Sequence, residues 1–489
     1  MVSRADVLIR AALNASSAFG RARRCWRDCG ARSLGIARIA RCPRRRMRLL
    51  VLNQYFHPDV AATGQLLTEL CVSLARAHEV RVITGFPTYD PLEPRRRRLF
   101  AREDVEGVRV LRVYTWRGSR RTLLSRALTY ATFLLSAVIA GLMVRRPDVV
   151  MTWTDPPLLP LVGWILARVR RRPLVIVVQD VYPDVAVRVG ALRHAGLIRL
   201  AEALLRMPLR RATRVVAISE GMRRRLVDKG LSAERIVVIP NWADGRAIIP
   251  CERANPFARA HGLDRVRVVL HAGNIGFVQD FETLLQCAEY LRAHEEADRV
   301  RIVLIGDGAS KRRLQQEVAA RRLTNVLLLP YQPKEDVKYA LASADVALIL
   351  LKPGLEGYVE PSKVYAIMAS GRPFIASIGS ESEVARIARE HRCGVVVPPG
   401  QPGALAEAVR ALLNDRSERE RLGRNGRRAL LRFYERTVAV DRYDRMLRAL
   451  CADARGGRPP TRDGGLRERF APSGRGAASL AMASARKSS

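Results

Sequence analysis

One short stretch, Val359 to Pro373, carries side chains suited to binding an anion. It reads VEPSKVYAIMASGRP and contains Lys363, although the only other lysines are at 229, 311, 334, 338, 352 and 487, and nearly all other basic residues are arginine. Pro361 can open a helix, so Glu360 and Ser362 fall at its start and Lys363 in its first turn. A cation there opposes the helix dipole unless an anion also binds. We therefore expect a diphosphate site, the alternative being a solvent-exposed lysine.

Three further loops combine glycine with polar residues at the ends of expected strands. Gly64 lies near a helix start, where backbone amides can face an anion, although a plain turn would also use glycine. The second half of the chain repeats this pattern at Gly273, Asn274 and Gly276, and again at Gly306, Gly308 and Lys311. None of these loops has the spacing of a Walker loop or of a full dinucleotide fingerprint, so we expect no cofactor.

Two sheets are needed to position these residues. Apolar runs alternate with helical segments, and the expected strands are 48–55, 79–85, 108–114, 148–153, 173–180, 214–219 and 236–241, then 266–273, 301–308, 325–331, 346–351, 373–378 and 393–400. Continuous apolar runs are typical of parallel strands buried on both faces. We predict an α/β fold of two doubly wound, Rossmann-like domains facing a cleft.

The predicted domains cover 47–245 and 255–430, and a helix over 431–452 could cross back to the first domain. The Arg-rich segment 1–46 shows no sustained strand or helix period. Residues 453–489 are rich in Gly, Pro, Ser and Arg and cannot bury enough apolar surface to fold. We expect both ends to be disordered basic tails.

The segment 127–144, ALTYATFLLSAVIAGLMV, is uncharged and flanked by arginines. Its length is near the lower limit for a membrane span, but a crossing between two strands of one sheet would disrupt the sheet. Two interpretations remain: a buried crossover helix, and a helix in the membrane interface whose neighbouring arginines reach lipid phosphates. Aspartates at Leu134 and Val138 would test the second.

The net charge of +38, from 85 Lys+Arg against 47 Asp+Glu, is almost all arginine. A GC-rich coding sequence would produce the same bias, so the charge is weak evidence for nucleic-acid binding, although it favours anionic partners such as membranes and phosphates. Among the cysteines only Cys25, Cys29 and Cys42 cluster, without a nearby histidine. We expect no zinc site, and the remaining thiols fit a reducing cytoplasm.

Residues 47 to about 450 resemble the bacterial family 4 glycosyltransferases with the GT-B fold, especially those of colanic-acid, O-antigen and exopolysaccharide biosynthesis. The matching motifs occur in the family's order: NQYFHPDVAATGQ, VITGFPTY, QDVYPD, AISEGMRRRL, VIPNWAD, GNIGFVQDFETLL, GDGASKRRL and EPSKVYAIMASGRPFIA. The resemblance implies retaining, metal-independent transfer of a hexosyl or N-acetylhexosaminyl group from a nucleoside diphosphate sugar. It further implies a lipid-linked saccharide acceptor at the cytoplasmic face of the inner membrane. Consistent with metal independence, the chain has no Asp-X-Asp pair.

The resemblance also assigns parts of the site. It places the donor diphosphate against the Gly64 loop, Gly273 to Gly276 and the Ser362–Lys363 turn, and the base and ribose near Gly306 to Lys311, Pro330 and Tyr331. Many relatives carry an arginine and a lysine where this chain has Asn274 and Gln279, and a glutamate where it has Ala366. Glu360 could substitute for that glutamate, and Lys363 becomes a major remaining cation for the leaving group.

Cleavage of the donor bond builds negative charge on the diphosphate, which Lys363 and preorganised amides would stabilise. Retention of configuration suggests that the departing phosphate helps to deprotonate the acceptor, so a dedicated base need not exist. Asp180, in VQDVYPD, is the carboxylate that we expect near the acceptor, and a cap for the following turn explains it equally well. His57 is a weaker candidate.

Three other functions fit parts of the sequence. A nucleotide-sugar epimerase of the same fold would act without an acceptor, and a pseudoenzyme that binds sugar nucleotides would explain the missing cations and Ala366. A nucleic-acid-binding protein would bind with a steep salt dependence. Against the last, the expected domains lack an RNA motif or a reading helix and aromatics are only 6% of residues, so we expect no nucleic-acid partner.

Overall fold

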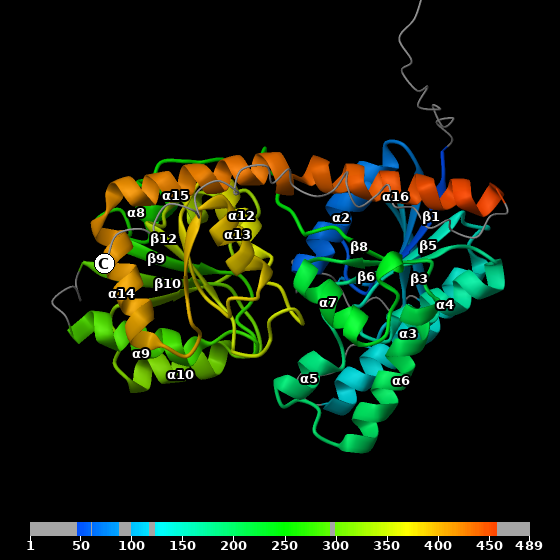
Figure 1. The fold of residues 1–489 in the computed structure, drawn as a ribbon, viewed down its shortest axis with the longest axis horizontal. Helices are drawn as coiled ribbons and strands as arrows, with labels where there is room; N and C mark the ends of the chain where they lie inside the picture. The colour runs from blue at the N-terminus through cyan, green and yellow to red at the C-terminus, as the bar shows by residue number, and fades with distance from the viewer. Residues whose placement is uncertain (1–45, 60, 88–98, 117–122, 294–298, 457–489) are drawn as a thin grey trace, which may run out of the picture. The chain divides into compact units, whose positions relative to one another are not determined.

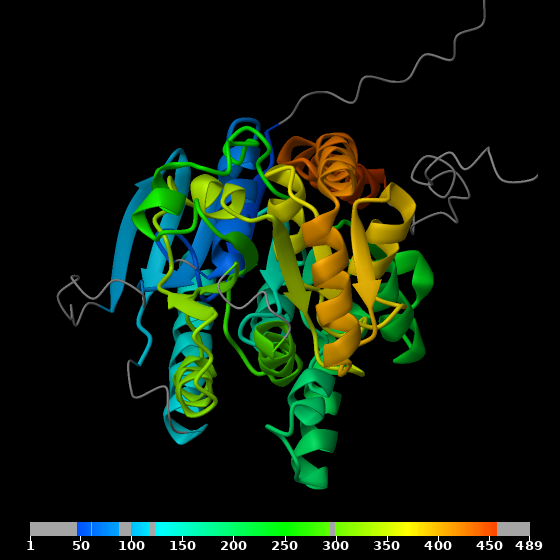
Figure 2. The same ribbon diagram turned by 90° about the vertical axis from the view of Figure 1, so that its left-hand side faces the viewer.

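The computed structural model describes residues 46–59, 61–87, 99–116, 123–293 and 299–456. The tails predicted at 1–46 and 453–489 therefore lie almost entirely outside the described residues. Two sheets, each with helices on both faces, make up the described part (Figures 1 and 2). The predicted pair of doubly wound α/β sheets is confirmed.

The first sheet has the order β3-β4-β2-β1-β5-β6-β7-β8. Its strands are β1 (Arg48–Leu52), β2 (Glu79–Gly85), β3 (Phe100–Val105), β4 (Val108–Val113), β5 (Val149–Trp153), β6 (Leu174–Val178), β7 (Arg214–Ala217) and β8 (Ile236–Val238). The accompanying helices are α2 (Ala62–Ala75), α3 (Leu123–Met143), α4 (Leu159–Arg170), α5 (Asp184–Arg188), α6 (Ala195–Arg211), α7 (Glu220–Asp228) and the 3-10 turn η1 (Ala233–Arg235).

Side chains alternate between the two faces of β1, as the period of a strand requires. Leu49 and Val51 join a core that includes residues of α2, whereas Leu50 and Leu52 join a core that includes residues of α3 and α4. Burial of each such aliphatic side chain contributes about 1.5–3 kcal/mol to folding. Because both faces are covered, the strand reads as an uninterrupted apolar run.

The strand β3 was missed by sequence analysis. It is a partly exposed edge strand, FAREDV, that pairs antiparallel with β4 through a turn in which Glu106 and Gly107 both have positive φ. An edge strand with solvent on one side needs no apolar run, so polar residues hid it.

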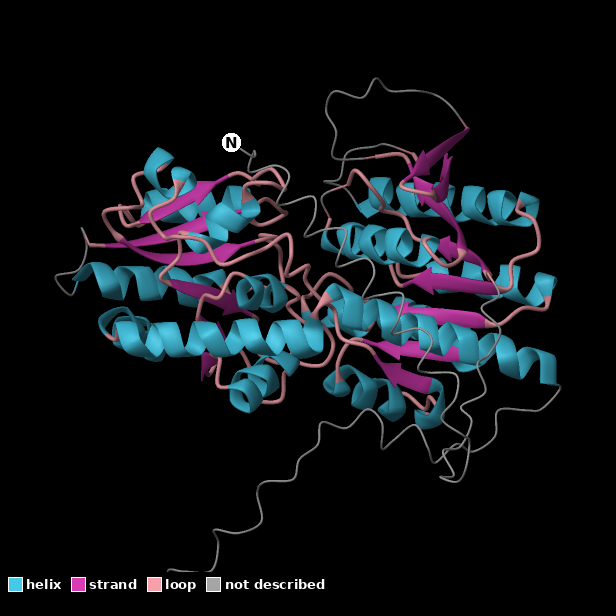
Figure 3. Cartoon of the chain, turned by 90° about the horizontal axis from the view of Figure 1, so that it is seen from above, coloured by secondary structure: helices cyan, strands magenta, loops and turns pink. Residues whose placement is uncertain are grey.

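The second sheet has the order β11-β10-β9-β12-β13-β14, and its strands are all parallel. They are β9 (Arg267–Ala272), β10 (Val300–Ile305), β11 (Val326–Leu329), β12 (Val346–Leu350), β13 (Phe374–Ser377) and β14 (Gly394–Val397). The helices are α8 (Pro256–Ala260), α9 (Phe281–Ala293), α10 (Lys311–Ala320), α11 (Val337–Ala342), α12 (Lys363–Ala369), α13 (Glu383–His391), α14 (Pro402–Asn414) and α15 (Arg416–Ala429). Figure 3 shows the strands of each sheet running between layers of helices.

The chain leaves the second sheet through a π-helical turn, η2 (Leu430–Tyr434), and the long helix α16 (Arg436–Gly456). This last helix packs against α2 of the first domain, where Tyr443 and Leu447 join the core that contains Leu49. His78 Nε2 also lies 2.6 Å from Asp444 Oδ1. The core of the N-terminal domain is thus completed by α16, which follows the second domain in the sequence.

The apolar segment 127–144 lies mainly in α3, which is amphipathic in its packing. Phe133, Ala137 and Ala140 are buried in the core, whereas Leu135 is 65% exposed and Met143 is 71% exposed. Among the described residues, no helix is both long and apolar enough to cross a membrane. Leu134 and Val138, the positions chosen from the sequence for a test of membrane contact, pack partly against the core and are therefore poor probes.

Candidate functional site

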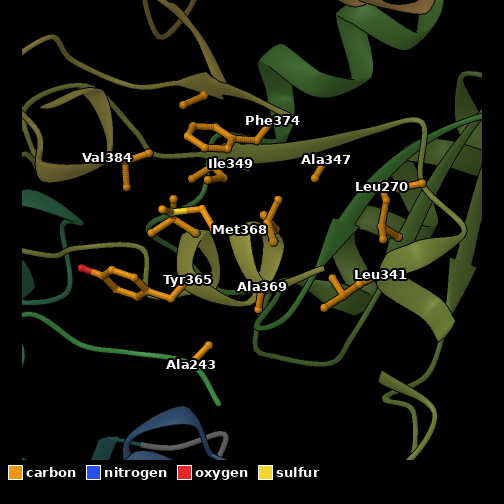
Figure 4. Close-up of a cluster of buried hydrophobic side chains, with 14 of the residues drawn as sticks. Ala243, Leu270, Leu341, Ala347, Ile349, Tyr365, Met368, Ala369, Phe374 and Val384 are labelled. Carbon is orange, nitrogen blue, oxygen red and sulfur yellow. The ribbon is translucent and has the colours of Figure 1, made fainter. Parts of the chain in front are cut away.

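The short helix α12 holds Lys363 at its first residue and is anchored in the core of the second domain. Tyr365, Met368 and Ala369 lie in a buried cluster with Phe374 and other residues from the sheet and its covering helices (Figure 4). The backbone N–H of Tyr365 donates to the carbonyl oxygen of Ser362 at 3.2 Å, which forms the first turn. Because the helix buries so much of its surface, the start of the Lys363 side chain is fixed relative to the sheet.

The Lys363 ammonium lies at the carboxyl end of β9. Its Nζ is 2.8 Å from Nε2 of His271, a fully buried residue of β9. It also lies beside the backbone of Gly273, since a Cβ added there would lie 3.6 Å from Nζ. The lysine and the glycine loop, 90 residues apart in the sequence, therefore lie side by side in the structure.

Within the described ranges, the Lys363 ammonium has a neutral partner and no carboxylate partner. Lys229 and Lys311 each pair with a carboxylate, whereas none of the ion pairs among the described residues includes Lys363. Burial lowers the pKa of Lys363 to about 7. A buried cation without a counter-ion is unfavourable, so this position would gain from an anionic ligand.

The two glycine loops of the second domain interlock. Gly273 (φ +125°) and Gly306 (φ +153°) adopt conformations that other residues rarely adopt, and a Cβ at Gly306 would overlap the carbonyl oxygen of Gly273. The N–H of Gly273 donates to the Ile305 carbonyl at 2.8 Å, and the N–H of Ile275 donates to the Asp307 carbonyl at 2.8 Å. These glycines are needed because backbone approaches backbone here.

The remaining predicted residues of this region surround the same loops. Gly276 donates its N–H to Gln279 Oε1 at 2.8 Å, and Gly308 is packed against Ile275 and Asn274. Lys311 Nζ lies 4.0 Å from Asp307 Oδ2 at the start of α10. The exposed Tyr331 places its hydroxyl 3.4 Å from the Asp307 carbonyl. The structure thus brings together the loops at 273–279, 306–311 and 331 and the side chain of Lys363.

Glu360 is directed elsewhere, although it is only three residues before Lys363. Its Oε1 accepts a hydrogen bond from the Ser219 hydroxyl at 2.9 Å, and its Oε2 accepts from the Glu383 N–H at 3.3 Å. Burial and the neighbouring Glu383 raise the pKa of Glu360 to about 8. Its carboxyl group is therefore occupied at the N-termini of α7 and α13.

Gly64, predicted in the first domain, lies in the first turn of α2. A Cβ there would lie 3.3 Å from Cβ of Tyr55, so the glycine lets the helix approach the loop after β1. The His57 side chain in this loop is exposed, and its carbonyl accepts a hydrogen bond from Arg112. Close packing therefore explains Gly64 without a ligand.

Carboxyl groups gather at the ends of adjacent strands in the first domain. Asp180 follows β6, and burial together with the charge of Asp155 raises the pKa of Asp180 to about 7. Asp155 follows β5 and accepts a hydrogen bond from the Thr63 hydroxyl at 3.1 Å. Burial, and to a lesser extent Asp59, raises the pKa of Asp155 to about 6. These groups can exchange protons near neutral pH.

The backbone brings Asp180 against the segment that leads to Lys363. Asp180 forms an antiparallel bridge with Val359, and the N–H of Val181 donates to the Tyr358 carbonyl at 2.9 Å. Tyr358 is buried between the guanidinium groups of Arg188 and Arg225, which lie 4.4 Å and 4.7 Å from its ring centre. Segments from both sheets therefore meet within four residues of Lys363.

Known glycosyltransferases are similar to this chain in sequence and share its two-sheet fold. The family described as "Glycosyl transferase 4-like domain" matches residues 62–242, and "Glycosyl transferases group 1" matches residues 256–429. Anabaena HepE in complex with UDP-glucose shares the fold, with a TM-score of 0.64 and 16% identity over 82% of this chain and 100% of that chain. The chain belongs to the GT-B glycosyltransferases.

Relatives of this glycosyltransferase extend over both domains. WbjE of Pseudomonas aeruginosa, described as a probable glycosyltransferase, is 28% identical over 69% of this chain and 84% of its own length. WcaI of Escherichia coli, described as a colanic acid biosynthesis glycosyl transferase, is 26% identical over 75% of this chain and 92% of its own length.

Two groups in this glycosyltransferase were missed by sequence analysis. His271 interrupts the apolar run of β9 two residues before Gly273, and a buried polar residue in a strand is a signal that a partner exists. Asp155 lies two residues after β5 in TWTDPP, and a carboxylate at the end of an apolar run is the signal that could have identified it. Within the described ranges, no group of three or more His, Cys, Asp or Glu side chains is arranged to hold a metal ion.

Proposed function

We propose that this glycosyltransferase moves a hexosyl or N-acetylhexosaminyl group from a nucleoside diphosphate sugar to a lipid-linked saccharide, with retention of configuration and without a metal ion. Lys363 and the Gly273 to Gly276 loop bind the donor diphosphate, and the loops at Gly306 to Lys311 and Tyr331 bind its nucleoside. Asp180 faces the acceptor hydroxyl. It either takes the hydroxyl proton itself or hydrogen-bonds to the hydroxyl while the departing phosphate takes the proton.

The observation that carries this proposal is the Lys363 ammonium, which lies beside Gly273 with His271 as its neutral partner and without a carboxylate in the described part of the chain. Charge develops on the leaving diphosphate as the bond to the sugar breaks. A preorganised donor at such a position can stabilise the transition state by about 3 kcal/mol. An ammonium already neutralised by a carboxylate would contribute less.

The described relatives support the rest of the proposal. HepE is solved with UDP-glucose, which fits a nucleoside diphosphate sugar as donor. WcaI is named for colanic acid biosynthesis, which fits a role in cell-surface polysaccharide assembly. The resemblance to exopolysaccharide glycosyltransferases implies a lipid-linked acceptor, so we infer that the acceptor lies at the cytoplasmic face of the inner membrane.

Transfer of label from a panel of UDP-, GDP- and dTDP-sugars into solvent-extractable lipid tests the proposal, using membranes that contain the protein or its Lys363→Ala variant. We expect transfer from one donor, strongly reduced in the variant and unaffected by a metal chelator. The anomeric configuration of the product reports retention. Nucleotide binding without transfer from any donor would favour a pseudoenzyme, and conversion of the donor without an acceptor would favour an epimerase.

A membrane-facing surface on α3 and α6 supports access to such an acceptor. The helix α4 packs against both of these helices. We define this surface by their exposed apolar residues: Leu128, Leu135, Ile139, Leu142, Met143, Leu197, Leu200 and Leu204. Exposed arginines flank it, including Arg145, Arg146 and Arg199. Apolar side chains bordered by arginines are typical of helices that lie at an anionic membrane interface.

Sedimentation with vesicles that contain anionic phospholipid tests the membrane-facing surface. Two aspartates, Leu135→Asp with Ile139→Asp, should weaken vesicle binding about tenfold because they remove apolar area and add repelled charge. Leu431→Asp, at an exposed leucine of η2, is the matched control and should bind as wild type. Equal binding by both folded variants would exclude this surface.

A further inference from the structure

The His271 ring is placed to hold the Lys363 ammonium. It lies in β9 without solvent exposure, packs edge-on against Phe281 at 5.3 Å between ring centres, and turns Nε2 toward Lys363 at 2.8 Å. Nδ1 is farther from the ammonium, at 3.5 Å. Sequence analysis assigned no role to this residue, and packing alone does not require a polar ring in this strand.

The chemistry of the pair fixes which atom donates. An ammonium has three donors and no acceptor, so Nε2 must present a lone pair and the proton of the neutral ring lies on Nδ1. Burial and the charge of Lys363 hold the pKa of His271 well below its usual range, so the ring stays neutral. Backbone groups of Asn274 and Leu348 favour the protonated ring and only partly offset this lowering of the pKa.

A lysine side chain carries its ammonium at the end of a flexible four-carbon stem. The ammonium therefore needs a fixed acceptor to keep one position. Two charged residues near these loops, Asp307 and Lys311, pair with each other at the start of α10, and Asp307 also accepts a hydrogen bond from the Gly308 N–H. Among the described residues, His271 is the ionisable group that hydrogen-bonds to Lys363. A neutral acceptor orients the ammonium and leaves its charge available to a ligand, which a carboxylate would not.

We propose that His271 is a positioning residue that holds the Lys363 ammonium against the Gly273 loop by accepting a hydrogen bond at Nε2. The proposal rests on the proposed function, in which Lys363 stabilises the leaving diphosphate. His271 itself does not touch the donor. Its contribution is preorganisation, so that the ammonium does not have to be ordered when charge develops on the phosphate.

Two substitutions separate this role from packing. His271→Met fills the site without a strong acceptor, and we expect kcat to fall about tenfold or more because the ammonium loses its charge-assisted hydrogen bond. His271→Gln can place Oε1 near the position of Nε2 and should restore most of the rate. Phe281→Leu disturbs the packing of the ring but leaves the acceptor, so it is the matched control and should affect kcat much less.

The pH profile provides a readout that packing would not move. An acceptor favours the charged form of Lys363, so its loss in His271→Met should shift the alkaline limb of kcat/KM to lower pH, whereas His271→Gln and Phe281→Leu should keep the wild-type limb. If His271→Met does not fold, His271→Leu replaces it, because a leucine side chain offers no acceptor and should show the same loss and shift.

The outcomes distinguish the two proposals. If wild-type protein transfers no sugar, the proposed function fails, and the pH dependence of UDP and GDP binding in the same variants still tests the positioning role. If the wild type is active and His271→Met matches Phe281→Leu in both rate and pH limb, His271 serves packing alone and the positioning role is wrong. A loss in His271→Gln as large as in His271→Met would also overturn it.

Discussion

The two sheets present opposite chemistry at the carboxyl ends of their strands. At the end of β9 in the second domain, an ammonium from Lys363 lies beside a glycine loop with a neutral histidine as its partner. At the ends of β5 and β6 in the first domain, burial and, to a lesser extent, a neighbouring carboxylate raise the pKa values of Asp155 and Asp180. In the part of the chain that the structure describes, the same fold thus carries a cation without a counter-ion on one side and crowded carboxyl groups on the other.

The proposed function gives both sites a part in the reaction, and burial shifts the pKa at each of them toward neutral pH. Burial disfavours the charged form of any group, so it lowers the pKa of Lys363 to about 7 and raises the pKa of Asp180 to about 7. An anionic ligand would then favour the protonated form of the lysine, and the deprotonated aspartate could accept a proton from a hydroxyl. In the proposed function, the first location binds the leaving diphosphate and the second faces the acceptor.

The largest effect should come from removal of the cation. Lys363→Ala should lower the transfer rate about a hundredfold, because the developing charge on the diphosphate loses a preorganised donor. Steady-state transfer with the active donor measures this. Lys352→Ala, at an exposed lysine of the same domain, should retain the wild-type rate. A wild-type rate in Lys363→Ala would remove the cation side of the comparison.

A smaller effect is expected on the carboxyl side. Asp180→Asn keeps the shape of the side chain but cannot accept a proton, so transfer should fall at least about tenfold while UDP or GDP binding stays unchanged. Isothermal titration measures the binding, and Asp228→Asn at an exposed position is the control. If the variant keeps its rate, Asp180 is a structural residue and the departing phosphate acts without it.

The smallest effect is the pH dependence, which tests both sides together. Lys363 must be charged and Asp180 must be deprotonated, so kcat/KM should rise with pH up to about 7 and then fall, about threefold between pH 7 and 8. Lys363→Arg, which stays charged, should flatten the alkaline limb, and Asp180→Asn should flatten the acid limb. A profile that is flat around neutral pH would show that these two groups do not control the reaction.

Much of this arrangement could be predicted from local patterns. Apolar runs identified the strands of both sheets except β3, whose polar residues belong to an exposed edge. The position of Lys363 just after Pro361 indicated a helix start, and α12 begins at Lys363. The face of α3 was not predicted, because Leu134 and Leu135 are alike in the sequence and differ only in whether the core covers them.

The sequence by itself determined the two doubly wound sheets, the glycine loops at their strand ends and the family to which the chain belongs, because apolar periodicity and glycine placement are local properties of the chain. Only the tertiary structure decided that Lys363 meets His271 and Gly273, that Glu360 turns to Ser219, and that Asp155 stands beside Asp180. These contacts join residues far apart in the sequence, and the pKa shifts that prepare them for chemistry arise from burial, which exists only once the two cores are packed.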